Sequence, residues 1–382
     1  MVRRVLCCHP SAERYGADRI FVESVRAFVE AGWSVTATLP GDGDLVGILR
    51  DAGADVVFCP TPVLRKAALR PTGLLTLLAE TARAIAPMTR LVRRVRPDLV
   101  YVNTVTVPAW LAVAKLFGKR VVVHVHEAED AVPAPIRTAL ALPLLAAHSV
   151  LVNSEATAAT VARGVGGLRG RIRLLYNGVE GPTEAITPRA EPRDPARIVL
   201  VGRLSPRKGT DIAIEAIGRL AVKRAVTLDV YGSVFTGYEW FETQLRQRIA
   251  DLDIADSVRL RGFRADVWPA YADADIALVP SRVEPFGNTA VEAQLAGVPV
   301  IVTDAQGLPE TVAGGRFGMI VPVEDPGALA DAINTLLDDW PAARATATEA
   351  TANARTTFAP ATYRARLLDI LTQGPLSEIA EP

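Results

Sequence analysis

The sequence has few cysteines, and they do not form a recognisable pair. Only three of its 382 residues are cysteine, and all three, Cys7, Cys8 and Cys59, lie in apolar, strand-like stretches. Their spacing fits neither a zinc site nor a disulfide framework. This excludes the small, disulfide-stabilised class of protein and fits a reducing cytoplasm.

Long hydrophobic runs are also missing. The first ten residues contain two arginines but no apolar core of signal-peptide length. The longest stretch without a charged side chain, residues 138–154, is interrupted by Pro143 and ends in Asn-Ser. It therefore predicts a buried helix followed by a strand rather than a membrane span. We expect a cytoplasmic protein.

The chain has no excess of charge of either sign, because 42 basic side chains balance 42 acidic ones. The balance hides an asymmetry: residues 1–180 contain 22 Lys and Arg against 15 Asp and Glu, and the remainder contains 20 against 27. A basic N-terminal half suggests an anionic partner, but a DNA-binding protein usually shows a denser basic stripe. Nucleic acid is not an expected partner.

Apolar runs of strand length alternate with amphipathic segments along the chain, a pattern typical of parallel sheets built from βαβ units. A proline-rich, aperiodic stretch at residues 181–196 predicts a linker. The expected fold is α/β, with two Rossmann-like doubly wound parallel-sheet domains facing across a cleft, the default ligand site. We assign residues 1–180 to an N-terminal domain and 197–359 to a C-terminal one. Residues 360–382 form a C-terminal helix that packs back toward the N-terminal domain.

The expected strands are the apolar runs themselves. In the first domain they are residues 3–8, 34–39, 55–59, 99–103, 120–126, 149–153 and 172–176. In the second they are residues 197–201, 227–231, 257–261, 276–280, 298–303 and 319–321.

The second domain opens with a buried strand that ends at Gly202 and is followed by Arg203, Arg207 and Lys208 before a helix. Cations at this point of an open α/β sheet attract phosphate. The segment is not a Walker loop, and no Gly-x-Gly-x-x-Gly follows the strand. A basic loop in water is the alternative interpretation.

The stretch Ser-Arg-Val-Glu-Pro-Phe-Gly-Asn-Thr-Ala-Val-Glu, residues 281–292, places Glu284 on a loop and Glu292 inside the helix that follows. The amide groups at the start of that helix, at Asn288, Thr289 and Ala290, could hold a second face of the same anion. Both carboxylates could then accept hydrogen bonds from sugar hydroxyls. Two alternatives stay open: Glu284 as a solvated loop charge, and Glu292 as the glutamate of a capping box that begins at Thr289.

These motifs, in this order, resemble the GT-B glycosyltransferases, specifically the retaining group called family 4. Residues 284–292 are similar to the family's Glu-x7-Glu element and residues 201–209 to its phosphate-binding segment. Residues 176–179, Tyr-Asn-Gly-Val, resemble the turn that closes its first domain, and residues 297–302 with 307–310 resemble the strand and turn after the glutamate helix. The resemblance covers nearly the whole chain.

The resemblance implies roles for particular residues. Glu284 would contact the hydroxyls of the donor sugar and Glu292 the nucleotide ribose, while Arg203 and Lys208 would neutralise the diphosphate. The residues implied as further donor contacts are Gly16, Gly202, Gly232, Phe263, Phe286, Gly287, Asn288 and Thr289. The N-terminal domain would bind the acceptor and the C-terminal domain the donor.

The family also places a histidine next to the transferred sugar. His124 and His126 share one face of an apolar strand. His126 is nearer the strand end and is the better match, so we assign it to catalysis, with Glu284, Arg203 and Lys208, and assign His124 to the structure. The family's N-terminal Gly-Gly pair is reduced here to Gly16, preceded by Tyr15, and Asp18 is interpreted as an acidic residue of the first helical turn.

No metal is assigned. Two Asp-x-Asp triplets, at residues 251–253 and 273–275, close helices ahead of strands and lie away from the expected site. Cationic side chains and helix dipoles would stabilise the leaving group instead. The nucleoside diphosphate sugar is a substrate, and no cofactor is expected.

A basic, leucine-rich flank spans residues 63–97. It contains one acid, Glu80, and eight basic residues: Arg65, Lys66, Arg70, Arg83, Arg90, Arg93, Arg94 and Arg96. Such a surface can lie on anionic lipid. A core-facing helix with a solvated basic face is the alternative. On the first interpretation the protein is peripheral on the inner face of the membrane and its acceptor can be lipid-linked.

The function indicated is transfer of a sugar from a nucleoside diphosphate sugar to an acceptor hydroxyl with retention of configuration, in the synthesis of a cell-surface polysaccharide, glycolipid or glycoconjugate. A glycosidase that uses Glu284 and Glu292 would leave Arg203 and Lys208 unexplained. A nucleotide-sugar epimerase on the same fold and a non-catalytic nucleotide-sugar-binding protein remain alternatives.

Overall fold

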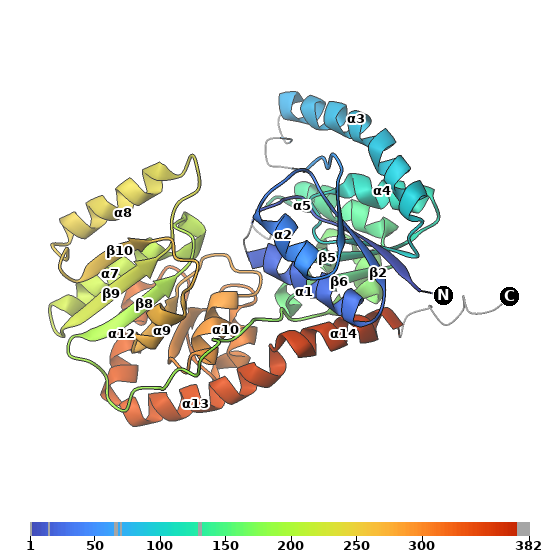
Figure 1. Ribbon diagram of the computed structural model, residues 1–382. Coiled ribbons are helices and arrows are strands. Elements are labelled where there is room, and N and C mark those ends of the chain that lie inside the picture. Colours follow the sequence, from blue (N-terminus) through green and yellow to red (C-terminus); the bar gives the residue numbers. More distant parts are fainter. Residues whose placement is uncertain (1, 14–15, 65–67, 69–70, 129–131, 373–382) are drawn as a thin grey trace. The chain divides into compact units, whose positions relative to one another are not determined.

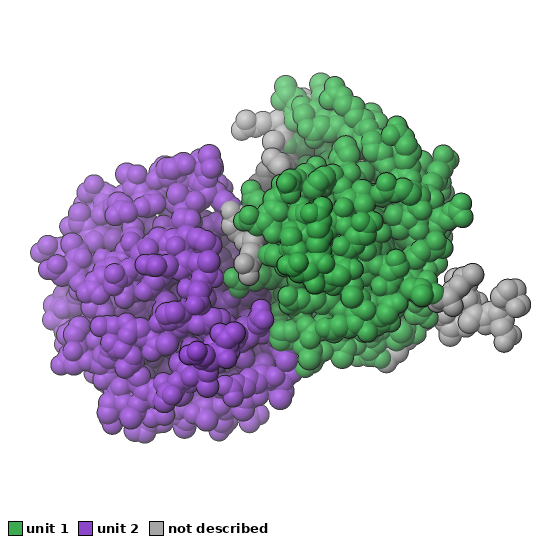
Figure 2. All heavy atoms as spheres, viewed as in Figure 1, with its two compact units in different colours: residues 1–178, 360–382 green, residues 179–359 purple. Residues whose placement is uncertain are grey.

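The chain forms two compact units, each built around one parallel sheet (Figure 1). The structure, a computed structural model, describes residues 2–13, 16–64, 68, 71–128 and 132–372. Unit 1 comprises Met1–Gly178 and Pro360–Pro382, and unit 2 comprises Val179–Ala359; Figure 2 colours them separately. Tyr15, Arg65, Lys66, Arg70 and the end of the expected C-terminal helix, residues 373–382, lie outside the described residues.

The seven strands of unit 1 pair in the order β3-β2-β1-β4-β5-β6-β7, all parallel. Each corresponds to an apolar run predicted above. Their bounds are β1 (Arg4–Cys8), β2 (Ser34–Leu39), β3 (Asp55–Phe58), β4 (Leu99–Val102), β5 (Arg120–Val125), β6 (Ser149–Val152) and β7 (Ile172–Leu174).

Helices cover both faces of this sheet, so the strand residues alternate between two apolar clusters. Leu6 and Cys8 of β1 pack with residues of α3 (Pro71–Val95) and α4 (Pro108–Leu116). Val5 and Cys7 pack with residues of α1 (Gly16–Glu30), α2 (Asp44–Asp51) and α14 (Pro360–Thr372). The remaining helices of the unit are α5 (Ala134–Ala141) and α6 (Glu155–Gly164), with short 3-10 turns at Leu142–Ala146 and Gly166–Arg171.

The last helix of the chain belongs to unit 1. Tyr363 and Leu367 of α14 are buried in the same cluster as Phe21 of α1. The Arg364 guanidinium contacts the carboxylates of Glu23 and, at 3.0 Å, Glu30. Helix α14 therefore completes the core on one face of the sheet although it lies about 180 residues beyond the rest of the unit in the sequence.

Only the second half of α3 is anchored in the core. Ala84, Met88, Leu91 and Val92 are buried there. In the first half, leucine side chains face solvent: the exposed fraction is 47% for Leu74, 67% for Leu75 and 56% for Leu78. Arg83, Arg90, Arg93, Arg94 and Arg96 are also exposed. The helix thus presents apolar and basic side chains together.

Unit 2 contains six parallel strands in the order β10-β9-β8-β11-β12-β13. Their bounds are β8 (Ala196–Val201), β9 (Val226–Tyr231), β10 (Val258–Gly262), β11 (Ile276–Val279), β12 (Val300–Thr303) and β13 (Met319–Val321), all at predicted runs. The order reverses between β8 and β11. In open α/β sheets, ligands bind beyond the carboxyl ends of the strands at such a point.

Aspartate side chains cap two of the helices of unit 2. Asp325 and Asp339 accept hydrogen bonds from backbone N–H groups at the starts of α12 and α13. Helix bounds are α7 (Thr210–Ala221), α8 (Glu239–Asp251), α9 (Trp268–Ala272), α10 (Asn288–Leu295), α11 (Leu308–Thr311), α12 (Pro326–Asp338) and α13 (Trp340–Thr357), with 3-10 turns at Pro206–Lys208 and Ala313–Gly315.

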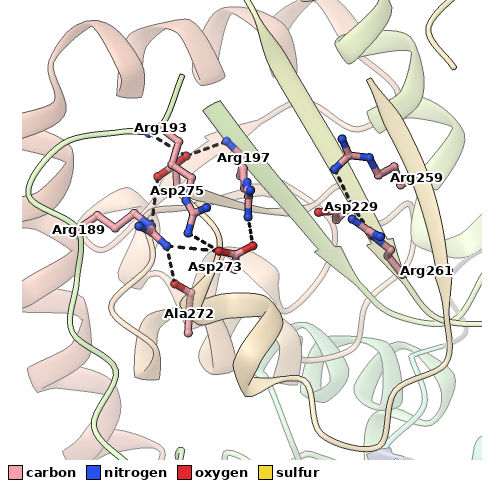
Figure 3. Close-up of polar contacts among 9 residues, drawn as sticks. All are labelled: Arg189, Arg193, Arg197, Asp229, Arg259, Arg261, Ala272, Asp273 and Asp275. Carbon is pink, nitrogen blue, oxygen red and sulfur yellow. Dashed lines mark hydrogen bonds and ion pairs between the residues drawn. The ribbon is translucent and has the colours of Figure 1, made fainter. Parts of the chain in front are cut away.

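The proline-rich stretch predicted as a linker has no helix or strand before β8, and ion pairs hold it against unit 2 (Figure 3). The Asp273 carboxylate contacts the guanidinium groups of Arg193 and Arg197, and Arg189 lies 3.5 Å from it. The buried Asp275 carboxylate accepts from the backbone N–H of Arg197 at 2.7 Å and of Arg193 at 3.2 Å. The second Asp-x-Asp triplet therefore fastens this stretch to the sheet.

Within the described part of the chain, no helix has the length and the apolar character that crossing a membrane requires.

Candidate functional site

The loop after β8 lies at the carboxyl edge of the unit 2 sheet and packs tightly against its neighbours. A Cβ on Gly232, which follows β9, would stand 1.8 Å from the carbonyl oxygen of Gly202. A Cβ on Gly209 would stand 1.8 Å from the carbonyl oxygen of Pro280, and its φ of +66° is in the left-handed region. Glycine at these two positions allows the backbones after β8, β9 and β11 to approach one another.

Two predicted cations lie on this loop. The guanidinium of Arg203 sits over the ring of Phe235, 3.1 Å from its centroid, in a cation–π contact. Lys208 ends the 3-10 turn, and its stem lies 3.9 Å from the position of a Cβ on Gly202. Both side chains are partly exposed, as groups that bind a ligand must be.

The structure brings Lys208 and Glu284 together although they are 76 residues apart in the sequence. The Lys208 ammonium forms an ion pair with Glu284 Oε2, and the Ser281 hydroxyl donates to the same oxygen at 3.1 Å. The lysine side chain is 27% exposed and the glutamate side chain 12%. Glu284 is therefore not a solvated loop charge, and the alternative that made it one is wrong.

Arg282, which the sequence reasoning did not select, fixes the loop that contains Glu284. Its guanidinium makes two hydrogen bonds to the Asp211 carboxylate, at 2.8 and 2.7 Å, and one to Glu324 at 2.7 Å. These acceptors raise the pKa of Arg282 above its ordinary value. The backbone N–H of Arg282 also donates to the Arg207 carbonyl at 2.8 Å. An arginine beside the Glu284 turn was the available signal, but its partners could not be read from the sequence.

Glu292 lies in α10 and is 5% exposed. Its Oε2 is 3.4 Å from the Tyr271 hydroxyl. The N-cap of α10 is Gly287, not Thr289, and no side chain caps the helix. The capping-box interpretation is therefore wrong, and the Glu292 carboxylate is buried beside the Tyr271 hydroxyl.

The start of α10 differs from expectation in one detail. The backbone N–H of Ala290 donates to the Gly287 carbonyl at 3.0 Å, so it is not available to an anion. The tight Gly287 turn, with φ of +112°, closes that bond. Asn288 and Thr289, at the first two positions of the helix, remain the predicted anion contacts.

The other residues implied as donor contacts differ in how exposed they are. Phe263, just after β10, is 68% exposed and accessible to a ligand. Phe286 is 2% exposed, and its ring lies 5.6 Å from that of Phe358, edge to face. Only the backbone of Phe286 can therefore meet a ligand. Gly16 is the first residue of α1 in unit 1.

His126 follows β5 at the carboxyl edge of the unit 1 sheet. Its ring lies 4.1 Å from that of His124, which confirms that the two side chains share a face. Burial lowers the pKa of His126 to about 3, so the ring is neutral at physiological pH. His124 is fully buried, and its Nδ1 is 2.8 Å from the Tyr101 hydroxyl, which agrees with a structural role.

Three polar residues that the sequence reasoning did not assign to the site lie beside His126. His126 Nε2 lies 3.1 Å from Asn103 Oδ1, Asn103 Nδ2 lies 3.2 Å from His9 Nδ1, and His9 Nε2 lies 2.6 Å from Asp18 Oδ1. His9 and Asn103 directly follow β1 and β4. The available signal was a polar residue directly after an apolar strand, at the edge where ligands bind.

Among the described residues, no group of three or more His, Cys, Asp or Glu side chains is arranged to hold a metal ion. Asp273 and Asp275 are engaged with arginines, and Asp251 accepts a hydrogen bond from Gln247 at 2.8 Å. The groups suited to a diphosphate are the cations Arg203 and Lys208, and those suited to a sugar are Glu284, Glu292 and His126.

Comparison with known proteins gives two family matches. Residues 14–180 match a family described as Glycosyltransferase Family 4, and residues 195–339 match one described as Glycosyl transferases group 1. Together the matches cover most of the chain.

Curated relatives match over part of their length. The chain is 34% identical over 210 residues to D-inositol 3-phosphate glycosyltransferase 2 of Catenulispora acidiphila, covering 50% of this chain and 48% of that protein. It is 33% identical over 168 residues to the lipopolysaccharide core biosynthesis mannosyltransferase LpsB of Rhizobium meliloti, covering 43% and 47%. The chain thus spans about half the length of these relatives.

Solved structures match the fold more completely. HepE of Anabaena, solved in complex with UDP and glucose, has a TM-score of 0.78 at 22% identity, covering 97% of this chain and 99% of that one. Sucrose-phosphate synthase of Thermosynechococcus elongatus has a TM-score of 0.76 at 21% identity, covering 97% and 98%. The two family matches show that the chain belongs to the family 4, or group 1, glycosyltransferases, and the likeness to these solved structures, together with the two parallel-sheet units, shows the GT-B fold.

Proposed function

We propose that the protein transfers a sugar from a nucleoside diphosphate sugar to an acceptor hydroxyl, with retention of anomeric configuration. The observation that supports this best is the pairing of Lys208 with Glu284 at the carboxyl ends of β8 and β11, where the strand order reverses. A cation for a diphosphate and a carboxylate for a sugar stand side by side there. Similar proteins agree with this proposal, since HepE was solved with UDP and glucose and LpsB is a mannosyltransferase.

In the proposed reaction the bond between the anomeric carbon and the diphosphate oxygen breaks, and its electron pair leaves with the diphosphate. The acceptor oxygen bonds to the anomeric carbon, and its proton passes to the departing diphosphate. Positive charge develops on the sugar ring and negative charge on the leaving group. Arg203 and Lys208 stabilise that negative charge, and losing one such donor typically costs about a hundredfold in rate.

Glu284 has a different part in the two states of the site. Without a donor it neutralises Lys208. When the diphosphate takes the lysine, the carboxylate is released to accept hydrogen bonds from the sugar hydroxyls. Glu292, held by Tyr271, is placed to accept from the ribose hydroxyls, and neutral His126 contributes a hydrogen bond to the transferred sugar.

The decisive experiment is a screen of nucleoside diphosphate sugars by thermal stabilisation, followed by transfer assays with the donor that binds. A ligand at about 100 times its dissociation constant adds about 2.7 kcal/mol to the free energy of unfolding. NMR of the anomeric proton in the product then tests retention. A product of inverted configuration would refute the mechanism, and no binding of any nucleoside diphosphate sugar would refute the function.

The same assays separate the alternatives. An epimerase would convert the donor without an acceptor and yield an isomeric sugar, and a binding protein would be stabilised by the donor without turnover. A transferase requires the acceptor for sustained product.

We propose further that the acceptor is a glycan precursor or a lipid-linked glycan of the cell surface, reached from the cytoplasmic face of the membrane. The support is α3, which exposes Leu74, Leu75 and Leu78 in its first half and basic side chains, among them Arg83 and Arg90, farther along the helix. Exposed leucines on a basic helix favour the surface of an anionic bilayer over water.

A further inference from the structure

Four polar side chains of unit 1 form a continuous chain of hydrogen bonds that runs from the interior to the carboxyl edge of the sheet. The members are Asp18, His9, Asn103 and His126, joined by contacts of 2.6, 3.2 and 3.1 Å. Asp18 is 5% exposed, and His9 and Asn103 are 1% exposed. Only His126, the last member, is partly exposed.

In this chain of hydrogen bonds, each contact determines which group donates and which accepts in the next. The Asp18 carboxylate can only accept, so His9 presents Nε2–H to it. The Asn103 amide nitrogen, which can only donate, faces His9 Nδ1 at 3.2 Å, so Nδ1 accepts and carries the lone pair. The Asn103 carbonyl oxygen in turn can only accept, so His126 carries its proton on Nε2. The lone pair of His126 is left on Nδ1.

We propose that Asp18, His9 and Asn103 are positioning residues that hold His126 as its Nε2–H tautomer, so that Nδ1 accepts a hydrogen bond from a hydroxyl of the transferred sugar. This inference rests on the proposed function for its last step, because it names the group of the donor that His126 recognises.

The location of these hydrogen-bonded residues, and the free-energy cost of burying them, support a functional role. His9, Asn103 and His126 follow β1, β4 and β5, which are neighbours in the sheet. Elsewhere, the same core is filled mainly by apolar side chains such as Phe21, Val25 and Leu39. Polar groups buried there lose favourable contacts with water, a free-energy cost that apolar side chains do not have. A fully hydrogen-bonded set of polar groups fixes the orientation of each member in return.

A neutral ring makes the tautomer matter. Burial lowers the pKa of His126 to about 3, so the ring has one N–H and one lone pair over the working range of pH. His9 is further held by stacking on Phe21, with ring centroids 4.5 Å apart. The wrong tautomer at His126 would present a donor where the sugar hydroxyl needs an acceptor.

The first test is independent of activity. The chain has four histidines, so selective 15N-histidine labelling with one His→Gln variant for each assigns every ring by NMR. In the wild type we expect His9 and His126 both as Nε2–H tautomers. In Asn103→Leu, which removes both links of the central amide at similar volume, we expect His126 to become a mixture of tautomers. His126 as the Nδ1–H tautomer, or His9 with protons on both nitrogens, would overturn the proposal even if transfer is confirmed.

The second test uses transfer kinetics with the donor identified by the screen. Asn103→Leu should lower kcat about tenfold, the effect of losing one well-oriented hydrogen bond, and change the affinity for the nucleoside diphosphate less than about twofold. Asn103→Leu should have no further effect on kcat in a His126→Ala background. The hydrogen-bond relay formed by Asp18, His9, Asn103 and His126 acts only through His126. Additive losses would show that Asn103 acts through the fold and would refute the relay.

The matched control is Thr61→Val. Thr61 is also buried in unit 1, accepts from Trp110 Nε1 at 3.2 Å and donates to the Cys59 carbonyl at 3.1 Å, and takes no part in the relay. It should leave the His126 tautomer and kcat unchanged. If no donor supports transfer in the wild type, the proposed function fails, and the tautomers still decide the relay.

Discussion

Replacing Glu284 with glutamine should strengthen the binding of a free nucleoside diphosphate while it weakens catalysis. In the structure the Lys208 ammonium is occupied by Glu284, so a diphosphate must first displace the carboxylate. Glutamine keeps the shape of the side chain but removes the competing charge. It also removes the charged acceptor proposed for the sugar hydroxyls, so turnover should fall.

The size of the gain follows from the burial of the pair. The Lys208 and Glu284 side chains are 27% and 12% exposed. This places the pair between an exposed ion pair, typically about 0.2–1 kcal/mol, and a buried one, so we take about 1–2 kcal/mol. The nucleoside diphosphate should therefore bind Glu284→Gln roughly 5- to 30-fold more tightly than it binds the wild type.

Isothermal titration calorimetry with nucleoside diphosphates measures this directly. Lys208→Met should weaken binding about 10- to 100-fold, the usual loss for a hydrogen bond to a charged group. The double variant should resemble Lys208→Met, because it has no lysine to release. Glu215→Gln is the matched control: it removes the same charge from an ion pair of the same unit, with Arg248 at 2.7 Å, and should leave binding unchanged.

Two results would refute this reasoning. Equal tightening in Glu284→Gln and Glu215→Gln would show an effect of net charge alone. Unchanged or weaker binding in Glu284→Gln, with Lys208→Met still impaired, would show that the carboxylate does not compete with the diphosphate.

Four further predictions concern pH, stability, metal and membrane. The pKa of His126 is about 3 in the folded state and near 6.5 in the unfolded state, so its contribution to the free energy of unfolding is complete above pH 6.5. That contribution is lost as the pH falls from 6.5 toward 3, by about 2 kcal/mol at pH 5. His126→Gln should therefore flatten the pH dependence of chemical unfolding. Asp275→Asn replaces a buried carboxylate that accepts two backbone N–H groups and should lower the free energy of unfolding by about 1–3 kcal/mol; no change in a denaturant titration would contradict that structural role. Transfer should survive EDTA, whereas a loss restored by magnesium would contradict the metal-free mechanism. Sedimentation with anionic vesicles should weaken as salt rises and be reduced by Leu75→Glu but not by Leu116→Glu, which changes a more exposed leucine on α4. Salt-independent sedimentation would exclude the basic flank as the cause.

The strands were predictable because parallel strands buried on both faces are continuous apolar runs. Residues 34–39 and 319–321 were predicted with the bounds that the structure has. The other strands differ by one or two residues at one end, except β10, which differs by one residue at each end. The turn from strand to helix around Glu284 was also predictable, since Pro-Phe-Gly ends one element and Gly297 and Pro299 end the next.

Contacts between distant residues were not predictable in the same way. Phe286 was implied as a donor contact, yet its side chain packs on Phe358, 72 positions later. The sequence placed Asp273 and Asp275 at the end of a helix, away from the expected site, but did not show that Arg189 and Arg193 of the proline-rich stretch and Arg197 of β8 surround them (Figure 3). The partner of a charged group depends on which elements pack together, and the local pattern does not contain that information.

The sequence by itself determined the two sheets, the edge at which each presents its loops, and the residue types gathered there, because hydrophobic periodicity and turn residues act locally. Only the tertiary structure decided that Lys208 meets Glu284 and that Asp18, His9, Asn103 and His126 form one directed chain. Strand order brings these residues together, and a hydrogen bond exists only when donor and acceptor come within about 3 Å at a suitable angle.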